Sequence, residues 1–434
     1  MPALEVLNVS VPEQPPDGVR AARIRVPEAG AVSDGFTLEL SGTVILAEGR
    51  ARAIELVCNG MPVREVPVDI TRTGLTQEFP DLPDELRCGF KALVGTLVLP
   101  AEFELELVAV GEDGRRFQVG SLTGRRAHPS PSVEPRLRAL MVTSVGRTGT
   151  VLLMRMLAAH PSVVVHPAGR YEVWPARYWA HMLAVLSAPA DHLRSAAPFG
   201  FDHDLWHVGQ NPFATAGPSD GALGAWLGRA HVDRLASFCL GNVEDWYAIA
   251  AREQGKEPVY FAEKNLLRTS VQGLGVSDLY PDAREVFLVR DFRDVACSML
   301  SFLGDKWRAD GYDSDRALRE LVAPLVQHLV SGWRARGEQA HLVRYEDLAL
   351  TPRDTLAGVF GFLGIDASES AVDDALRSGA DERSFTGHGT SPTVEQSVGR
   401  WAREGDEAFR DTLNEVLRES LVEFGYAEAP AEHV

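Results

Sequence analysis

A short loop rich in glycine and threonine is the part of this 434-residue chain best suited to bind an anion. Residues 143–150 are Thr-Ser-Val-Gly-Arg-Thr-Gly-Thr, and they lie between the apolar run 139–142 and the largely apolar run 151–157. This pattern predicts a buried strand, a tight loop and then an amphipathic helix. Because backbone N–H groups at such a loop and helix start attract negative charge, we expect a phosphate-type ligand here.

The loop also offers side chains that suit an anion. Arg147 is a cation, and Thr148 and Thr150 carry hydroxyl donors. The loop of P-loop nucleoside triphosphatases requires a lysine and a different glycine spacing, and both are absent here. The candidate anion-binding residues of the loop are Gly146, Arg147, Thr148, Gly149, Thr150 and Val151. The alternative is a strand–helix turn with no ligand.

A second motif lies about 140 residues further on. The β-branched run 285–289 predicts a strand that ends near Arg290, and Asp291 and Asp294 are typical of the first turns of a helix. Ser298 follows Arg290 by eight residues, so this helix can bring both side chains to one site. The alternative is a surface arginine and a serine inside a helix.

Two lesser motifs follow. Residues 342–348, Leu-Val-Arg-Tyr-Glu-Asp-Leu, place Tyr345 at a predicted strand end, and residues 397–401, Ser-Val-Gly-Arg-Trp, form a late loop. Core packing is the alternative role for Tyr345, and a solvated charge is the alternative role for Arg400.

Together, the motifs over about residues 137–425 resemble those of sulfotransferases that use 3′-phosphoadenosine 5′-phosphosulfate (PAPS). Residues 157–161, Leu-Ala-Ala-His-Pro, are similar to the Golgi-type and bacterial branches of this family. The resemblance implies an α/β, P-loop-like sulfotransferase fold around a mainly parallel sheet. It also implies that the first loop binds the 5′-phosphosulfate and that Arg290 and Ser298 bind the 3′-phosphate. Tyr345 would then pack near the adenine, and Gly399, Arg400 and Trp401 would close over the nucleotide.

Sulfuryl transfer, like phosphoryl transfer, depends mainly on positioning and on stabilising spread negative charge. The resemblance implies in-line transfer from PAPS to a hydroxyl, which leaves adenosine 3′,5′-bisphosphate. We expect no metal, since Arg147 can supply positive charge on the leaving side and Lys264 can reach the sulfuryl oxygens. A surface lysine is the alternative role for Lys264.

Three residues compete for the role of general base. In the branches that the chain resembles, a glutamate often follows His-Pro; here Ala168 stands near that place. Glu172 is the first choice because it lies shortly after the second strand. His166 is the second because of its ordinary pKa near neutrality, and Glu263, next to Lys264, is the third.

Residues 171–247 are the candidate acceptor region. Aromatic side chains there suit stacking on sugars or natural-product scaffolds: Tyr171, Trp174, Tyr178, Trp179, Trp206, Trp226, Trp246 and Tyr247. The alternative is that they pack the core of a helical insertion. A loosely spaced metal site at Asp202, His203, Asp204 and His207 is a weaker alternative.

The chain divides into three predicted parts. Residues 1–123 show short alternating strands typical of an N-terminal all-β sandwich, residues 124–136 form a linker, and residues 137–434 form the α/β domain. Strands are expected at 139–144, 162–166, 258–262, 285–290 and 341–345, with helices at 150–159, 173–188, 291–303, 313–336, 353–363 and 405–424.

The overall composition limits the classes of function. A net charge of −18 should repel nucleic acid and acidic membranes. Four scattered cysteines, no basic leader and no long apolar run predict a soluble cytoplasmic protein, bacterial in style. These features are compatible with a homodimer. The alternative functions are a P-loop kinase or NTPase-like enzyme and a catalytically inactive nucleotide-binding module.

Overall fold

The computed structural model describes residues 2–188, 228–266, 275–304, 313–336, 340–379, 395–404 and 406–427. The chain forms two compact units. The first comprises residues 1–134, 177–242 and 274–281, and the second comprises residues 135–176, 243–273 and 282–434. The predicted boundaries of a front domain, a linker and an α/β domain stay a prediction.

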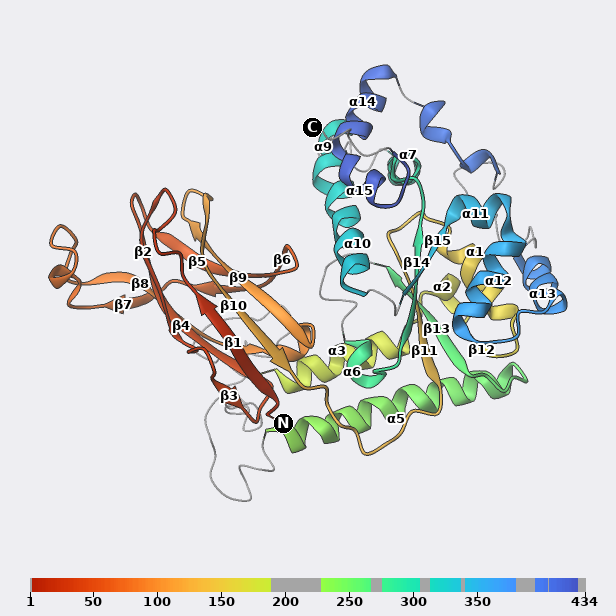
Figure 1. Cartoon of the computed structure of the whole chain (residues 1–434), viewed down its shortest axis with the longest axis horizontal. Coiled ribbons are helices and arrows are strands. Elements are labelled where there is room, and N and C mark those ends of the chain that lie inside the picture. Colours follow the sequence, from red (N-terminus) through yellow and green to blue (C-terminus); the bar gives the residue numbers. More distant parts are fainter. Residues whose placement is uncertain are drawn as a thin grey trace, which may run out of the picture. The chain divides into compact units, whose positions relative to one another are not determined.

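The first unit contains two antiparallel sheets (Figure 1). The six-stranded sheet has the order β3-β1-β10-β9-β5-β6, with strands Val32–Ser33, Leu4–Ser10, Arg116–Arg126, Glu102–Gly111, Ala51–Cys58 and Met61–Pro67. The four-stranded sheet has the order β2-β4-β8-β7, with strands Val19–Val26, Thr37–Leu46, Leu86–Gly95 and Ile70–Arg72. Residues of β5 and β6 contact β8, so the two sheets touch. The short alternating strands expected in residues 1–123 are present, with β4, β5 and β9 among them.

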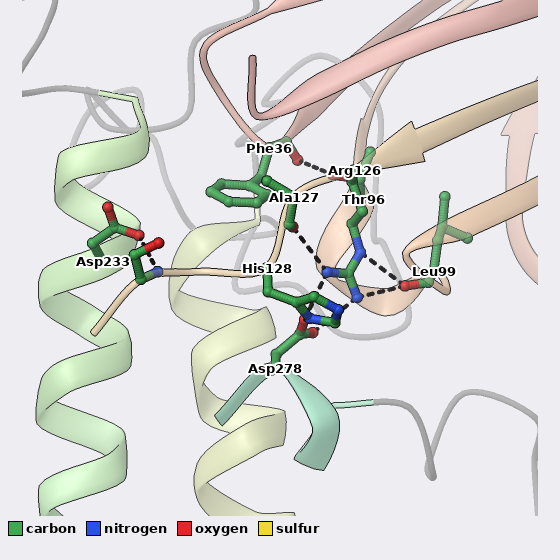
Figure 2. Close-up of polar contacts among 9 residues, drawn as sticks. Phe36, Thr96, Leu99, Arg126, Ala127, His128, Asp233 and Asp278 are labelled. Carbon is green, nitrogen blue, oxygen red and sulfur yellow. Dashed lines mark hydrogen bonds and ion pairs between the residues drawn. The ribbon is translucent and has the colours of Figure 1, made fainter. Parts of the chain in front are cut away.

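Three short stretches of helix belong to the first unit as well. They are most of α3 (Pro175–Ser187), the part of α5 (Arg229–Glu253) that precedes Val243, and α6 (Val276–Leu279). A buried ion pair ties α6 to the end of β10: Arg126 donates to both carboxylate oxygens of Asp278 at 2.6 and 2.9 Å and also to the carbonyl of Leu99 (Figure 2). His128 Nδ1 lies 2.9 Å from the same carboxylate. Because a charge left alone in such a place is costly, this pairing fixes α6 against the strands.

The second unit is built on a five-stranded sheet with the order β12-β13-β11-β14-β15. All of its pairings are parallel, which confirms the predicted parallel sheet. Its strands are Val163–Val164, Tyr260–Leu266, Arg138–Ser144, Arg284–Val289 and Ala340–Arg344. They are largely apolar on both faces, as expected for a sheet covered by helices on both sides, except for the buried Glu263, Lys264 and Asn265 of β13.

Helices cover the two faces of this sheet with separate cores (Figure 1). One core includes residues of α1 (Thr150–Ala159), α11 (Tyr345–Leu350), α12 (Pro352–Leu363) and α13 (Glu369–Gly379). The other includes residues of α7 (Phe292–Leu303), the π-helical segment Leu318–Val322, α10 (Ala323–Arg336), α14 (Glu407–Val416) and α15 (Arg418–Glu423). Shorter elements are α2 (Ala168–Tyr171), α9 (Ser314–Ala317) and the 3₁₀ turns Leu75–Gln77, Thr96–Val98, Glu395–Ser397 and Arg400–Ala402.

Most expected elements of this unit are present within a few residues of their predicted bounds. The helix expected at 405–424 is two helices, α14 and α15, separated at Leu417. The 25-residue α5 and the amphipathic α13 were not expected as helices. Tyr345 is the first residue of α11 rather than the last of a strand.

The described part of the chain bears on two other predictions. No helix in it is long and apolar enough to cross a membrane. Cys58, Cys88, Cys239 and Cys297 are buried and free of disulfide bonds.

Candidate active site

The topology of the sheet places the loop after β11 where ligands bind in this kind of architecture. β11 pairs with β13 on one side and with β14 on the other, so the order of the strands reverses at β11. Ligands of open parallel sheets bind outside the carboxyl ends of the strands at such a point. The motifs after β11, β13, β14 and β15 therefore come to one edge of the sheet.

The loop between β11 and α1 is tightly built. Arg147 and Gly149 both have left-handed backbone, with φ values of 72° and 91°. Thr148 is fully buried, and its hydroxyl donates to the carbonyl of Val145 and contacts Ser144 Oγ. The Thr148 hydroxyl thus shapes the loop, and α1 begins directly after the loop, at Thr150.

Three arginines from three distant segments meet beside this loop. Arg147 Nε donates to Ser298 Oγ at 3.1 Å, and Arg290 Nη1 donates to the Arg147 carbonyl at 3.0 Å. Arg400 Nη2 donates to Ser301 Oγ, one turn along α7 from Ser298. The structure therefore brings together Arg147, Arg290, Ser298 and Arg400 in one cluster, although the resemblance assigns Arg147 to the 5′-phosphosulfate and Arg290 and Ser298 to the 3′-phosphate.

The three guanidinium groups affect one another. Burial lowers the pKa of Arg147, and the positive charges of Arg290 and Arg400 lower it further. Arg290 and Arg400 are each only 4% exposed. Like charges held together and partly out of water favour the binding of an anion that carries several negative charges.

One buried donor in this cluster tests whether a nucleotide phosphate would fit. Within the described part of the chain, Arg290 Nε is buried without a hydrogen-bond partner. Buried donors are nearly always satisfied in proteins. The donor set, three guanidinium groups and the Ser298 hydroxyl, is of the kind that binds phosphate through charge-assisted hydrogen bonds.

The late loop predicted to close the site lies against the same arginines. Arg290 Nη2 donates to the carbonyl of Ser397 at 2.5 Å, and Ser397 Oγ lies 2.8 Å from the hydroxyl of Tyr345. The Arg290 guanidinium lies 4.9 Å from the centre of the Tyr345 ring. Tyr345 is buried among core residues at the same time, so it both packs and faces the arginine cluster.

A separate charged pair joins Lys264 of β13 to Glu172, which directly follows α2. Lys264 is 1% exposed, and its Nζ is 3.4 Å from Glu172 Oε1, whose side chain is about half exposed. Burial lowers the pKa of Lys264, Glu172 opposes this shift, and Arg170 adds to it. Lys264 pairs in register with Val142, two residues before β11 ends, so the pair is one strand away from the anion loop.

The backbone before Glu172 is unusual. Gly169, Arg170 and Tyr171 all have left-handed conformations, with φ values of 59°, 60° and 65°. Two of these residues are not glycine, so the turn stores strain of the kind often found at functional sites. The turn directs Glu172 toward Lys264.

Glu263 points away from this pair. Successive residues of a strand face opposite sides of a sheet, and Glu263 accepts hydrogen bonds from the N–H of Ala176 and the hydroxyl of Tyr247, both at 2.7 Å. It is 1% exposed and holds the start of α3. This geometry favours a structural role for Glu263 over that of a base.

Of the other candidates in this region, some lie within the described residues and others do not. His166 is half-buried and its ring lies 5.3 Å from that of Trp246. Tyr247 is fully buried and stacks on Phe261 at 4.3 Å, which supports core packing for this aromatic residue. Asp202, His203, Asp204, Trp206, His207 and Trp226 lie outside the described residues. No cluster of three or more metal-ligating side chains occurs among the residues that the structure does describe.

A comparison with protein families gives a match to the model of the "Sulfotransferase family" over residues 139–369, more than half of the chain. The chain belongs to the sulfotransferase family. The matched range begins with β11 and the anion loop, and it includes Glu172, Lys264, Arg290 and Tyr345. No curated protein matches the sequence at the significance required.

Solved sulfotransferase structures are similar to the chain at low identity. A mouse sulfotransferase complexed with PAP is 12% identical, with 66% of this chain and 84% of that chain covered and a TM-score of 0.37. The sulfotransferase from Alicyclobacillus acidocaldarius is 15% identical, with coverages of 68% and 95% and a TM-score of 0.36. Sulfotransferase STF9 from Mycobacterium avium is 16% identical, with coverages of 69% and 79% and a TM-score of 0.37.

Two residues of the candidate site were not predicted from the sequence. Ser301 and Phe302 face the arginines: Ser301 accepts from Arg400, and the Phe302 ring lies 4.7 Å from the Arg147 guanidinium. Ser301 lies three residues after Ser298 on α7, so helical periodicity from the Arg290 motif is the signal that finds it.

Gly149 is the position of the loop least able to accept a side chain. A Cβ atom there would lie 2.4 Å from the Tyr345 ring, and its φ of 91° suits only glycine. We expect Gly149→Ala to lower the free energy of unfolding by about 1–3 kcal/mol through backbone strain, with ring displacement in addition. Urea denaturation measures this change.

Gly146→Ala is the matched control in the same loop. Its φ is not positive, and an added Cβ would meet only Met299 Cε at 3.5 Å, an ordinary contact. Equal unfolding free energies for the two variants would contradict the role given to Gly149.

Proposed function

We propose that this sulfotransferase moves a sulfuryl group from PAPS to a hydroxyl of a carbohydrate or natural-product acceptor, by in-line transfer that leaves adenosine 3′,5′-bisphosphate. The observation that supports this most is the meeting of Arg147, Arg290 and Arg400 with Ser298 beside the loop that follows β11. A doubly phosphorylated adenosine has the charge and the number of acceptor oxygens that such a cluster needs.

The residues would divide the work in the following way. Arg290, Ser298 and Arg400 bind the 3′-phosphate, the loop Gly146–Val151 and the start of α1 bind the 5′-phosphosulfate, and Tyr345 packs near the adenine. PAPS, when bound, supplies the sulfuryl group and the leaving phosphate. Arg147 contacts Ser298 here, and its predicted role on the leaving side remains part of the proposal.

The pair of Glu172 and Lys264 supplies the acceptor side. Glu172 takes the proton of the acceptor hydroxyl, and Lys264, held charged by Glu172, stabilises the transferring oxygens. His166 is the alternative base, and it lies beside Trp246. Sulfuryl transfer in this scheme needs no metal, since arginine and lysine side chains supply the positive charge.

Two other functions remain to be separated by experiment. A P-loop kinase or NTPase-like enzyme would bind ATP with Mg²⁺ in preference to adenosine 3′,5′-bisphosphate. An inactive nucleotide-binding module would bind the bisphosphate but transfer no radiolabelled sulfate to any acceptor panel.

Several finer predictions stand beside this proposal. Contacts of β5 and β6 with β8 support a β-sandwich in the first unit, which would present substrate or mediate a homodimer. A cytoplasmic location and a bacterial origin stay predictions from composition.

Arg290 is the residue whose loss should be specific to the 3′-phosphate. We expect Arg290→Ala to weaken binding of adenosine 3′,5′-bisphosphate by about 10- to 100-fold, because a charge-assisted hydrogen bond contributes about 1.5–3 kcal/mol. Calorimetry compares this nucleotide with adenosine 5′-phosphate, which should lose much less affinity.

Arg353→Ala is the control, since Arg353 is an exposed arginine of α12 paired with Asp373. An equal loss of affinity for both nucleotides in Arg290→Ala would contradict the assignment to the 3′-phosphate.

Glu172→Gln tests the general base. The variant keeps the shape of the side chain but cannot accept the proton, so we expect turnover to fall by about 10²–10⁴-fold while nucleotide affinity stays near that of the parent protein. Steady-state rates and calorimetry give the two quantities. Glu253→Gln, at the end of α5, is the control; near-normal turnover in Glu172→Gln would move the role to His166.

The pH dependence of turnover tests Lys264. Burial lowers its pKa below the ordinary 10.5, so the side chain loses its charge earlier as the pH rises. We expect turnover to fall on the alkaline side below pH 10.5, and Lys264→Arg to move this fall to higher pH, because arginine stays protonated. An alkaline fall at the same pH in both proteins would exclude Lys264 as its cause.

A further inference from the structure

Asp294 is a fully buried carboxylate in the middle of the arginine cluster. It lies on the first turn of α7, four residues before Ser298 on the same helix, and Arg290 lies just before the helix starts. None of the roles assigned above uses Asp294. A negative charge so close to a predicted phosphate site requires a specific reason, because it repels the ligand that the site is built to hold.

The contacts of Asp294 give that reason. Its Oδ2 accepts a hydrogen bond from the N–H of Gly399 at 2.7 Å, and its Oδ1 accepts one from the N–H of Trp401 at 2.8 Å. Both oxygens are thus used, each by a backbone donor of the late loop. Among the side chains, only a carboxylate offers two acceptor oxygens without a donor.

Electrostatics show how the carboxylate is accommodated. Burial raises the pKa of Asp294, while the two N–H groups and the charge of Arg290 lower it. Burial has the largest effect on the pKa, so keeping this carboxylate ionised in the interior costs free energy. Such a cost is consistent with a role in fixing the loop.

The loop that Asp294 holds begins the turn that carries Arg400. Gly399 has a φ of 67° and precedes the 3₁₀ turn Arg400–Ala402. Arg400 is nearly buried, with its guanidinium on Ser301 and on Glu404. Asp294 therefore accepts hydrogen bonds from the residues on both sides of Arg400.

We infer that Asp294 is a positioning residue: it holds Gly399 and Trp401 against α7 so that Arg400 joins Arg290 and Ser298 in binding the 3′-phosphate. The identity of the phosphate rests on the proposed function. Asp294 acts through Arg400 and does not itself contact the nucleotide.

Asp294→Asn tests this role with almost no change in volume. The amide can accept only one of the two hydrogen bonds, and its NH₂ group faces the other N–H, so the loop must move. We expect affinity for adenosine 3′,5′-bisphosphate to fall about tenfold or more and affinity for adenosine 5′-phosphate to change less than about twofold, measured by calorimetry. Glu346→Gln is the matched control, since Glu346 is a half-buried carboxylate whose pKa is also raised, but it accepts from Asp291 N and Tyr426 Oη.

A double-mutant cycle with Arg400→Met separates positioning from a general loss of stability. If Asp294 acts through Arg400, adding Asp294→Asn to Arg400→Met should weaken binding of the bisphosphate by less than about twofold. An additive loss in the double variant would overturn the inference. If the asparagine variant fails to fold, Asp294→Glu serves in its place, because it keeps the charge but shifts both oxygens by one methylene group, and the same selective loss is expected.

The outcomes distinguish this inference from the function on which it rests. If the parent protein does not bind adenosine 3′,5′-bisphosphate, the proposed function fails and the inference fails with it. If the parent protein binds and Asp294→Asn loses affinity equally for both nucleotides, or for neither, the inference alone is overturned.

Discussion

The repulsion among three partly buried arginines is the constraint on which the candidate site depends. Arg147 comes from the loop after β11, Arg290 from the end of β14, and Arg400 from a turn more than a hundred residues later. Their like charges disfavour such a meeting, and the pKa of Arg147 is lowered first by burial and then by the charges of Arg290 and Arg400. The packing of α1 and α7 on opposite faces of the sheet provides the free energy that holds them together. An anion with several negative charges replaces the repulsion among the three arginines with an attraction of each arginine to the anion.

The alternation of side chains along β13 then divides the chemistry between the two faces of the sheet. Lys264 shares its face with Tyr260 and Ala262, in the core that contains α1, and there it meets Glu172. Glu263 faces α5 and holds the hydroxyl of Tyr247. Two adjacent ionisable residues thus have separate roles, and a shift of one residue in strand register would exchange them.

The sequence was sufficient to predict the parallel sheet, because its strands are apolar runs bounded by turns and each is followed by a polar motif. It also placed the motifs after the parallel strands at one edge, but it assigned Arg147 to the 5′-phosphosulfate and Arg290 and Ser298 to the 3′-phosphate, so the direct contact of Arg147 with the other two was not predicted. It did not predict the interior of the site. That Glu172 faces Lys264 depends on three left-handed residues at 169–171, and no local signal distinguishes that turn from an ordinary helix start. The helix α5 was missed because its apolar stripe is weak beside its many charged residues.

Asp294 shows why a residue can be recognised by its local chemistry and still be misjudged. An aspartate in the first turns of a helix is favourable wherever it points, so the sequence explains it completely without reference to any partner. Only the fold shows that the helix start is already capped by Asp291, which accepts from the N–H of Arg293. The second carboxylate is then surplus to the helix, and its two oxygens are used by the N–H groups of a loop a hundred residues away. Because its own helix does not require Asp294, the buried charge is better explained by the distant segment that it holds in place. Here that segment is the backbone on either side of Arg400.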